Sequence, residues 1–219
     1  MKKLFVLFFC FFFFSVCAEN HSFFGGNFSA TFANGSIDYG VGGGYSVIGY
    51  YGGNKNLYAS VGFVADVSSD RKMITDELQG LGVNDISVRF FSVPCRFGYA
   101  VEHNLNDNIC LLVVPSLACD CHFLHSDFQV STSGGTVNYS LSGMGYSVGV
   151  AVDAGIKQTV GNMLIRYGLD CDVRLFTFLF VDAAYSGSSN GTGKYAVKNT
   201  LADYSMITVS PYVAVGFKW

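Results

Sequence analysis

The sequence predicts an all-β protein: an antiparallel, up-and-down transmembrane β-barrel of eight strands. Three observations support this fold class. An export signal precedes a chain that is half apolar, yet no long apolar helix follows it. Apolar residues alternate with small or polar ones over unusually long stretches. After the first, the polar segments between these stretches alternate between short and long, as barrel turns and loops do.

The N-terminus has the three parts of a secretory signal peptide. Lys2 and Lys3 precede an apolar run of 13 residues, positions 4–16, and Ala18 provides a small residue at the exit. The run is shorter than the ~20 residues that a membrane-spanning helix needs. We therefore predict a signal peptide at residues 1–18 and one domain at residues 19–219. A retained membrane anchor, or lipidation of Cys17, is the alternative interpretation.

The composition of the chain after Ala18 is unusual for a soluble protein. Without Lys2 and Lys3, 11 basic residues remain against 16 acidic ones, which argues against a nucleic-acid partner. The whole sequence is 50% apolar and 13% charged, so a closed barrel is the remaining way to satisfy a backbone in lipid. Five cysteines remain, an odd number that excludes a fully paired disulfide framework.

Polar segments divide the chain into eight stretches that we interpret as strands. Short segments lie at residues 34–36, 53–56, 102–108 and 160–162, and long ones at residues 68–85, 125–142 and 182–203. Outer-membrane barrels have short periplasmic turns and long outer loops. The pattern therefore places the turns near residues 54, 106 and 161 in the periplasm, and the segment at 34–36 is an unusually short outer loop.

Alternation persists over 10 to 13 residues in the clearest stretches, those that begin at residues 57, 144, 163 and 207. Soluble strands usually run ~5–6 residues, whereas a transmembrane strand needs ~9–11. The first stretch, residues 24–32, is short and weak. Between residues 86 and 101 the parity flips, which predicts a β-bulge near Phe90 and Phe91. Pro94, Pro115 and Pro211 fall inside strands, where bulges or local breaks must absorb a missing N–H.

The last strand ends in a pattern that is specific in an exported chain. Val213, Val215, Phe217 and Trp219 place an apolar residue at every second position. This ending resembles the terminal signal that bacterial outer-membrane barrel proteins present to their insertion machinery. Together with the strand count, the chain is similar to the small eight-stranded outer-membrane proteins of the OmpA-transmembrane, OmpX and OmpW type. The resemblance implies an outer-membrane location, with lipid, the insertion machinery and periplasmic chaperones as partners.

Charged residues at inward positions predict an ionic network in the lumen. Six acids face six bases: Asp38, Asp66, Asp120, Asp153, Asp170 and Asp172 against Arg89, Arg96, Lys157, Arg166, Arg174 and Lys218. Because eight strands leave room inside for little more than side chains, we favour a closed ionic core. A charged, selective pore is the alternative.

Two further motifs are weaker. Cys119, Asp120, Cys121 and His122 resemble a ligand cluster, but in a strand they point alternately to opposite faces. His125 and the adjacent serine also point apart, so we predict no catalytic residue, metal or cofactor. The function that we favour is a structural or surface-interaction protein with exposed outer loops. A transporter of small solutes, hydrophobic ones included, is the alternative, and an outer-membrane enzyme comes third.

Overall fold

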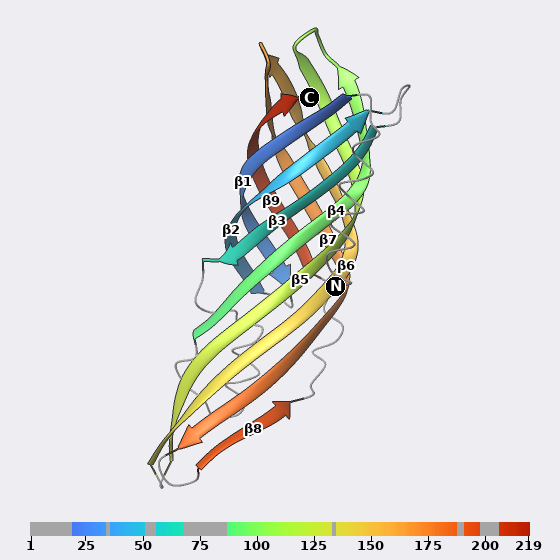
Figure 1. Ribbon diagram of the computed structural model, residues 1–219. Helices are drawn as coiled ribbons and strands as arrows, with labels where there is room; N and C mark the ends of the chain where they lie inside the picture. Colours follow the sequence, from blue (N-terminus) through green and yellow to red (C-terminus); the bar gives the residue numbers. More distant parts are fainter. Residues whose placement is uncertain are drawn as a thin grey trace.

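The computed structural model describes residues 19–33, 36–50, 56–67, 87–132, 135–187, 191–197 and 206–219. The predicted signal peptide therefore lies outside the described residues, as does the predicted loop at 68–85. Among the described residues, no helix is long and apolar enough to cross a membrane. The strands are β1 (Glu19–Ala33), β2 (Ser36–Tyr50), β3 (Asn56–Asp66), β4 (Ser87–Asn104), β5 (Ile109–Thr132), β6 (Gly135–Val160), β7 (Met163–Gly187), β8 (Gly191–Val197) and β9 (Met206–Lys218) (Figure 1).

Eight of these strands form a closed antiparallel ring, which confirms the predicted fold class. Each strand from β1 to β7 pairs with the next, and β9 pairs with both β7 and β1. Strand β8 stays outside the ring. It pairs with Val181–Gly187 of β7, farther along that strand than the twelve-residue segment Met163–Arg174 that pairs with β9. The ring therefore has no open edge between its first and last strands.

Strands β5, β6 and β7 are much longer than a bilayer requires, with 24, 26 and 25 residues. With β8 they extend well beyond the ends of β1–β3 (Figure 1). We call residues 125–132, 135–142, 182–187 and 191–197 the projecting sheet, and the opposite end, with the turns at 105–108 and 161–162, the short-turn end. The prediction of long loops at 125–142 and 182–203 is wrong for residues 125–132, 135–142, 182–187 and 191–197, which are paired strands; the other residues of these segments lie outside the described residues.

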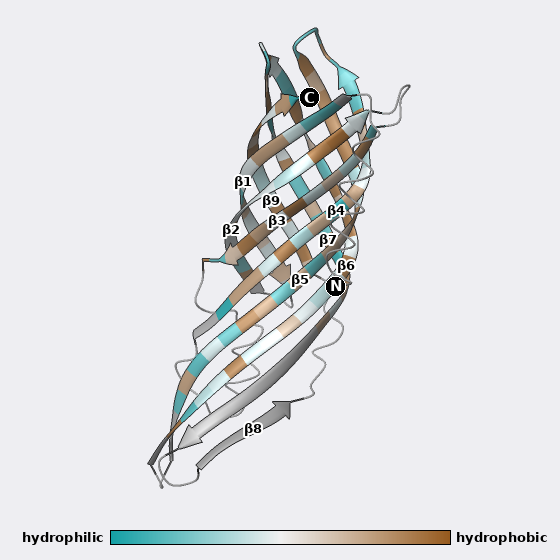
Figure 2. Cartoon of the chain, viewed as in Figure 1, coloured by the Kyte–Doolittle hydropathy of each residue, from teal (hydrophilic) through white to brown (hydrophobic). Residues whose placement is uncertain are grey.

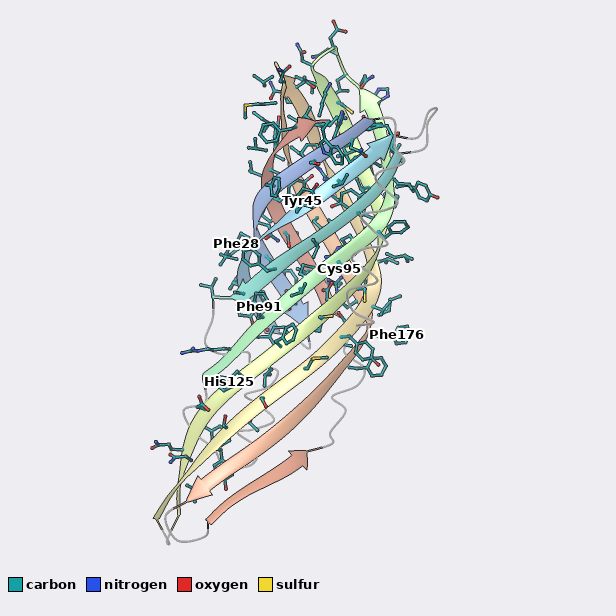
Figure 3. The ribbon with its side chains drawn as sticks, in the orientation of Figure 1. Phe28, Tyr45, Phe91, Cys95, His125 and Phe176 are labelled. Carbon is teal, nitrogen blue, oxygen red and sulfur yellow. The ribbon has the colours of Figure 1, made fainter. Side chains whose placement is uncertain are left out.

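The outer face of the ring is apolar, as the alternation predicts. Hydrophobic and hydrophilic residues alternate along the ring strands (Figure 2). On β9 Ile207, Val213, Val215 and Phe217 are exposed at odd positions, whereas Met206, Ser210 and Ala214 are buried. Phe28, Phe91 and Phe176 are exposed on the outer surface of three different strands (Figure 3). Exposed apolar side chains around a closed ring are what lipid contact requires. The protein is a transmembrane β-barrel.

The bulge expected near Phe90 and Phe91 is absent from the described strands, and that prediction is wrong. The register between β4 and β5 runs unbroken through both residues. Phe90 is 7% exposed and points into the lumen, and Phe91 is 37% exposed on the outer face. A lumen-facing aromatic ring produced the apparent change in parity. The register shift that does occur lies opposite Val148 and Gly149, where β7 has Leu175 as an extra residue.

Each proline coincides with a break in one ladder. Pairing between β3 and β4 lapses for two residues at Pro94, between β4 and β5 at Pro115, and between β1 and β9 at Pro211. The register is the same on both sides of each gap. A proline cannot donate to the ladder, so the neighbouring strand loses one hydrogen bond there while the ring keeps its alignment.

The position of the bilayer can be tested by placing a cation on the outer face. Val152→Arg, in the middle of the apolar band of β6, is expected to lower the free energy of unfolding by about 2–4 kcal/mol. The matched control Gln129→Arg lies on the outward face of the projecting sheet and should change it by less than about 0.5 kcal/mol. Urea unfolding in lipid vesicles measures both, and equal losses would contradict the assigned band.

Candidate functional site

The lumen at the short-turn end contains a buried polar network. Lys157 donates to Glu102 Oε1 at 2.6 Å and to the hydroxyl of Tyr50 at 2.9 Å. The Tyr50 hydroxyl in turn donates to Glu102 at 2.6 Å and lies 2.8 Å from His21 Nδ1. An ammonium group removed from water needs such partners, and here it has a carboxylate and a hydroxyl.

An apolar layer lies next along the barrel. It is a cluster of buried side chains contributed by seven strands: Phe23, Ile48, Tyr58, Ala100, Leu112, Val114, Leu164 and Ala214, with Tyr50 packed against it. Leu112 and Leu164 are fully buried within it. Because side chains from opposite walls meet here, the layer separates the short-turn end from the rest of the lumen.

Arg166 lies directly above this layer and is 2% exposed. Its guanidinium donates to Asp153 Oδ2 at 2.6 Å and to the Tyr212 hydroxyl at 3.1 Å, and that hydroxyl donates to Asp153 Oδ1 at 2.7 Å. The rings of Phe23, Tyr58 and Tyr212 lie 5.2–5.7 Å from the guanidinium carbon. A carboxylate and three aromatic faces together replace the water that this cation loses on burial.

A ladder of ion pairs follows toward the projecting end. Arg96 donates to Asp120 Oδ1 at 3.0 Å and also contacts Asp172. Arg174 contacts the same two carboxylates. Asp170 is held less closely, with its Oδ2 3.6 Å from Arg96. Two guanidinium groups thus share three carboxylates across β4, β5 and β7.

A cavity of ≈ 180 Å³ lies beside this ladder. One wall consists of small or polar residues of β1–β3, and the other carries the ladder and Arg166. Gly25 shows why the first wall is small: a Cβ atom there would lie 2.6 Å from the Cβ of Ala214 on the adjacent strand. The cavity can therefore hold a small polar solute or several waters, and Phe23, Tyr58 and Ala214 of the apolar layer line part of it.

The structure places most of the predicted lumen residues inside the barrel. Asp38, Asp120, Asp153, Lys157, Arg166, Asp172 and Arg174 are buried, and Asp66, Arg96 and Asp170 are partly buried. Lys218 occupies an inward position at the end of β9 but is exposed. Arg89 is the correction: it is exposed on the outer face, because Phe90 takes the inward position beside it.

Glu102 and His122 are two lumen residues that lie outside the predicted ionic network. Glu102 was assigned to a turn, although its even position on the same strand as Arg96 would have placed it inside. His122 lies between two serine hydroxyls, with Nδ1 3.0 Å from Ser92 and Nε2 2.9 Å from Ser147. Uncharged partners such as these leave no charge pattern in the sequence.

The terminal strand closes the ring. The backbone N–H of Trp219 donates to the carbonyl of Asn20 at 2.9 Å, and the N–H of Asn20 donates back at 2.8 Å. The indole of Trp219 also donates to the Ser22 hydroxyl. Val213, Val215 and Phe217 are exposed on the outer face of the same strand. A role for this ending in membrane insertion stays a prediction.

The possible ligand cluster on β5 divides between the two faces as expected. Cys119 and Cys121 are exposed, and Asp120 and His122 are buried. His125 and Ser126 also separate: the histidine is exposed and the serine is buried. Each motif therefore has its members on opposite sides of the sheet, so neither converges on one point.

The ring's outer face and its interior together determine where the protein resides. Exposed apolar side chains occur on the outward faces of all eight ring strands, whereas the lumen carries the buried ion pairs. Closed antiparallel barrels of this kind occur in bacterial outer membranes. This is an outer-membrane β-barrel protein.

Comparison with solved structures returns proteins of the same architecture. The chain is similar to Ail, the attachment invasion locus protein of Yersinia pestis, at 9% identity and a TM-score of 0.46, over 93% of this chain and 100% of that one. It is also similar to Neisserial surface protein A, at 8% identity and a TM-score of 0.49, over 91% of this chain and 97% of that one. A major outer membrane protein from Thermus thermophilus matches at 11% identity and a TM-score of 0.49, over 92% of this chain and 100% of that one.

No protein-family model matches the chain, and no curated protein matches it in sequence. The fold assignment rests on the ring of strands and its apolar surface.

The ionic ladder makes a quantitative prediction. Asp120→Asn is expected to lower the free energy of unfolding by about 3–5 kcal/mol. The substitution removes a carboxylate that Arg96 and Arg174 share, and part of their buried positive charge is then uncompensated. Asp107→Asn removes the same charge from the exposed turn between β4 and β5 and serves as the control. Urea unfolding followed by heat-modifiable gel migration measures the difference, and equal midpoints would contradict the assigned role.

Proposed function

We propose that the protein is a closed outer-membrane barrel that acts as a surface-interaction protein, presenting its projecting sheet outside the cell. The main observation is the apolar layer across the lumen, with the Lys157–Glu102 pair below it and Arg166 above it. A solute crossing the barrel would have to displace all three. The lumen is thus suited to hold the barrel together rather than to conduct.

The projecting sheet supports a role at the surface. Phe63, Phe91 and Phe123 form a ladder of rings on the outer face, with centroids 6.4 and 6.2 Å apart. Aromatic residues of this kind mark the edge of the apolar band in outer-membrane barrels. Farther along β5, the outward side chains become polar: His125, Asp127 and Gln129. The sheet therefore leaves the lipid at this level.

Cross-strand contacts keep the projecting sheet ordered. The rings of Phe128 and Tyr139 stack at 5.2 Å across β5 and β6. A hydrogen bond from Ser140 lowers the pKa of Asp127 below its ordinary value, and His125 contributes to the same effect. Such pairs stabilise a two-stranded ribbon that extends into water. A rigid ribbon offers a partner a preformed surface, which lowers the entropic cost of binding.

A second candidate function is the transport of a small solute. The cavity of ≈ 180 Å³ favours it, because a closed structural barrel does not need that space. Transport would require the apolar layer to open, and conductance distinguishes the two functions.

The closed lumen predicts no steady conductance of the wild-type protein in planar bilayers. Ile48→Ala/Leu112→Ala removes volume from the apolar layer and is expected to permit ion flow. Val41→Ala/Leu111→Ala shortens two side chains on the outer face of the same two strands and should show no conductance. Steady wild-type channels whose ion selectivity shifts in Arg166→Gln or Asp170→Asn would instead support the transporter.

The orientation predicts which turn is accessible from outside. An epitope tag inserted between residues 133 and 134, which link β5 to β6, should bind antibody on intact cells. The same tag between Leu105 and Asn106, at the short-turn end, should bind only after the outer membrane is permeabilised. Labelling of the second tag on intact cells, with the first silent, would reverse the orientation and overturn the proposal.

A further inference from the structure

Arg89 is an unexpected cation on the lipid-facing side of the barrel. Its side chain is exposed on the same face as Phe91 and the other outward residues of β4. Within the part of the chain that the structure describes, its electrostatic interaction is with Asp127 on β5. A charge at the bilayer midplane costs about 2–4 kcal/mol and near the interface only about 0–1. Its depth therefore decides whether it can be tolerated.

The strand register fixes that depth. Phe91 pairs with Phe123 in the aromatic ladder, and the next outward-facing pair toward the projecting end is Arg89 with His125. Ser142 lies opposite His125 on β6. Arg89 is thus one outward pair beyond the aromatic ladder, where hydrocarbon gives way to lipid headgroups.

The surroundings of Arg89 leave its guanidinium available to a ligand. The nearest described acid is Asp127, which lies one outward pair farther along β5. Asp127 accepts a hydrogen bond from Ser140 and lies with its Oδ2 3.1 Å from His125 Nε2, and both lower the pKa of Asp127 more than Arg89 does. The guanidinium carries five donors in a planar fork that matches phosphate oxygens. At this depth the abundant anion is the phosphate of a lipid headgroup.

We propose that Arg89, flanked by His125 and Ser142 on the next two strands, binds the phosphate headgroup of a lipid in the outer leaflet. The aromatic ladder below it contacts the acyl chains of the same lipid. The bound lipid would fix the depth of the barrel at the point where the projecting sheet emerges. This inference rests on the proposed orientation, which the epitope tags test separately.

The experiment uses the purified, folded protein in neutral detergent micelles. Thermal unfolding is followed while phosphatidic acid, a lipid with a phosphate monoester headgroup, is titrated in. Phosphatidylcholine, whose phosphodiester is balanced by its choline cation, is the zwitterionic comparison. Phosphatidic acid should stabilise the wild type, and Arg89→Gln should need about tenfold more of it for the same shift. Arg89→Lys, which keeps the charge but lacks the fork, should fall between them.

Lys218→Gln is the matched control, because it removes one exposed cation at the opposite end of the barrel. It should respond as the wild type does. Equal losses in Lys218→Gln and Arg89→Gln would show attraction by net charge alone and overturn the site. An unchanged response of Arg89→Gln would do the same. Stabilisation by inorganic phosphate at matching concentrations would indicate a site for a free anion instead of a lipid.

If Arg89→Gln fails to fold, Arg89→Lys still tests the inference, since loss of the fork alone must weaken the response. Failure of the proposed orientation would appear as wrong tag exposure with lipid dependence intact. Failure of this site would appear as correct tag exposure without lipid dependence.

Discussion

Closure of the ring between β1 and β9 is the constraint on which the rest of the structure depends. In hydrocarbon every backbone N–H and C=O needs a partner within the protein, so the first and last strands must pair. The reciprocal bonds between Asn20 and Trp219 complete that pairing at the short-turn end. The unbroken register on both sides of each proline shows the same constraint: one hydrogen bond is lost, but the alignment that closes the ring is kept.

Closing only eight strands makes the lumen narrow, and narrowness dictates its chemistry. Side chains from facing walls must touch, so any charge inside must find a partner within reach. Asp120 and Asp172 are each shared by two arginines, and Lys157 has Glu102. Removing one partner leaves a buried charge uncompensated. The network therefore links strands that are far apart in the sequence and stabilises their packing.

Alternation in the sequence was enough to predict the ring, its apolar outer face and most of the lumen charges. Alternation gave wrong predictions where the polarity of a residue does not indicate whether its side chain points to the lumen or to the lipid. Phe90 is apolar but points inward, so its neighbour Arg89 was placed on the wrong side. Glu102 was taken for a turn residue because polar neighbours surround it. Strand β8 and the ends of β5–β7 were taken for loops, because their Ser, Gly and Asn composition is shared by loops and by solvated strands.

The positions of Phe90 and Arg89 follow from one packing choice. Inside the barrel, the ring of Phe90 lies 5.2 Å from that of His122 and fills the lumen where the strands leave the bilayer. Turning Phe90 inward obliges Arg89 to face outward, because adjacent residues of a strand point to opposite faces. That exchange is favourable only near a headgroup layer, where an exposed cation costs little and can find a phosphate. The proposed headgroup contact would therefore tie the depth of the barrel in its membrane to the lumen packing of Phe90.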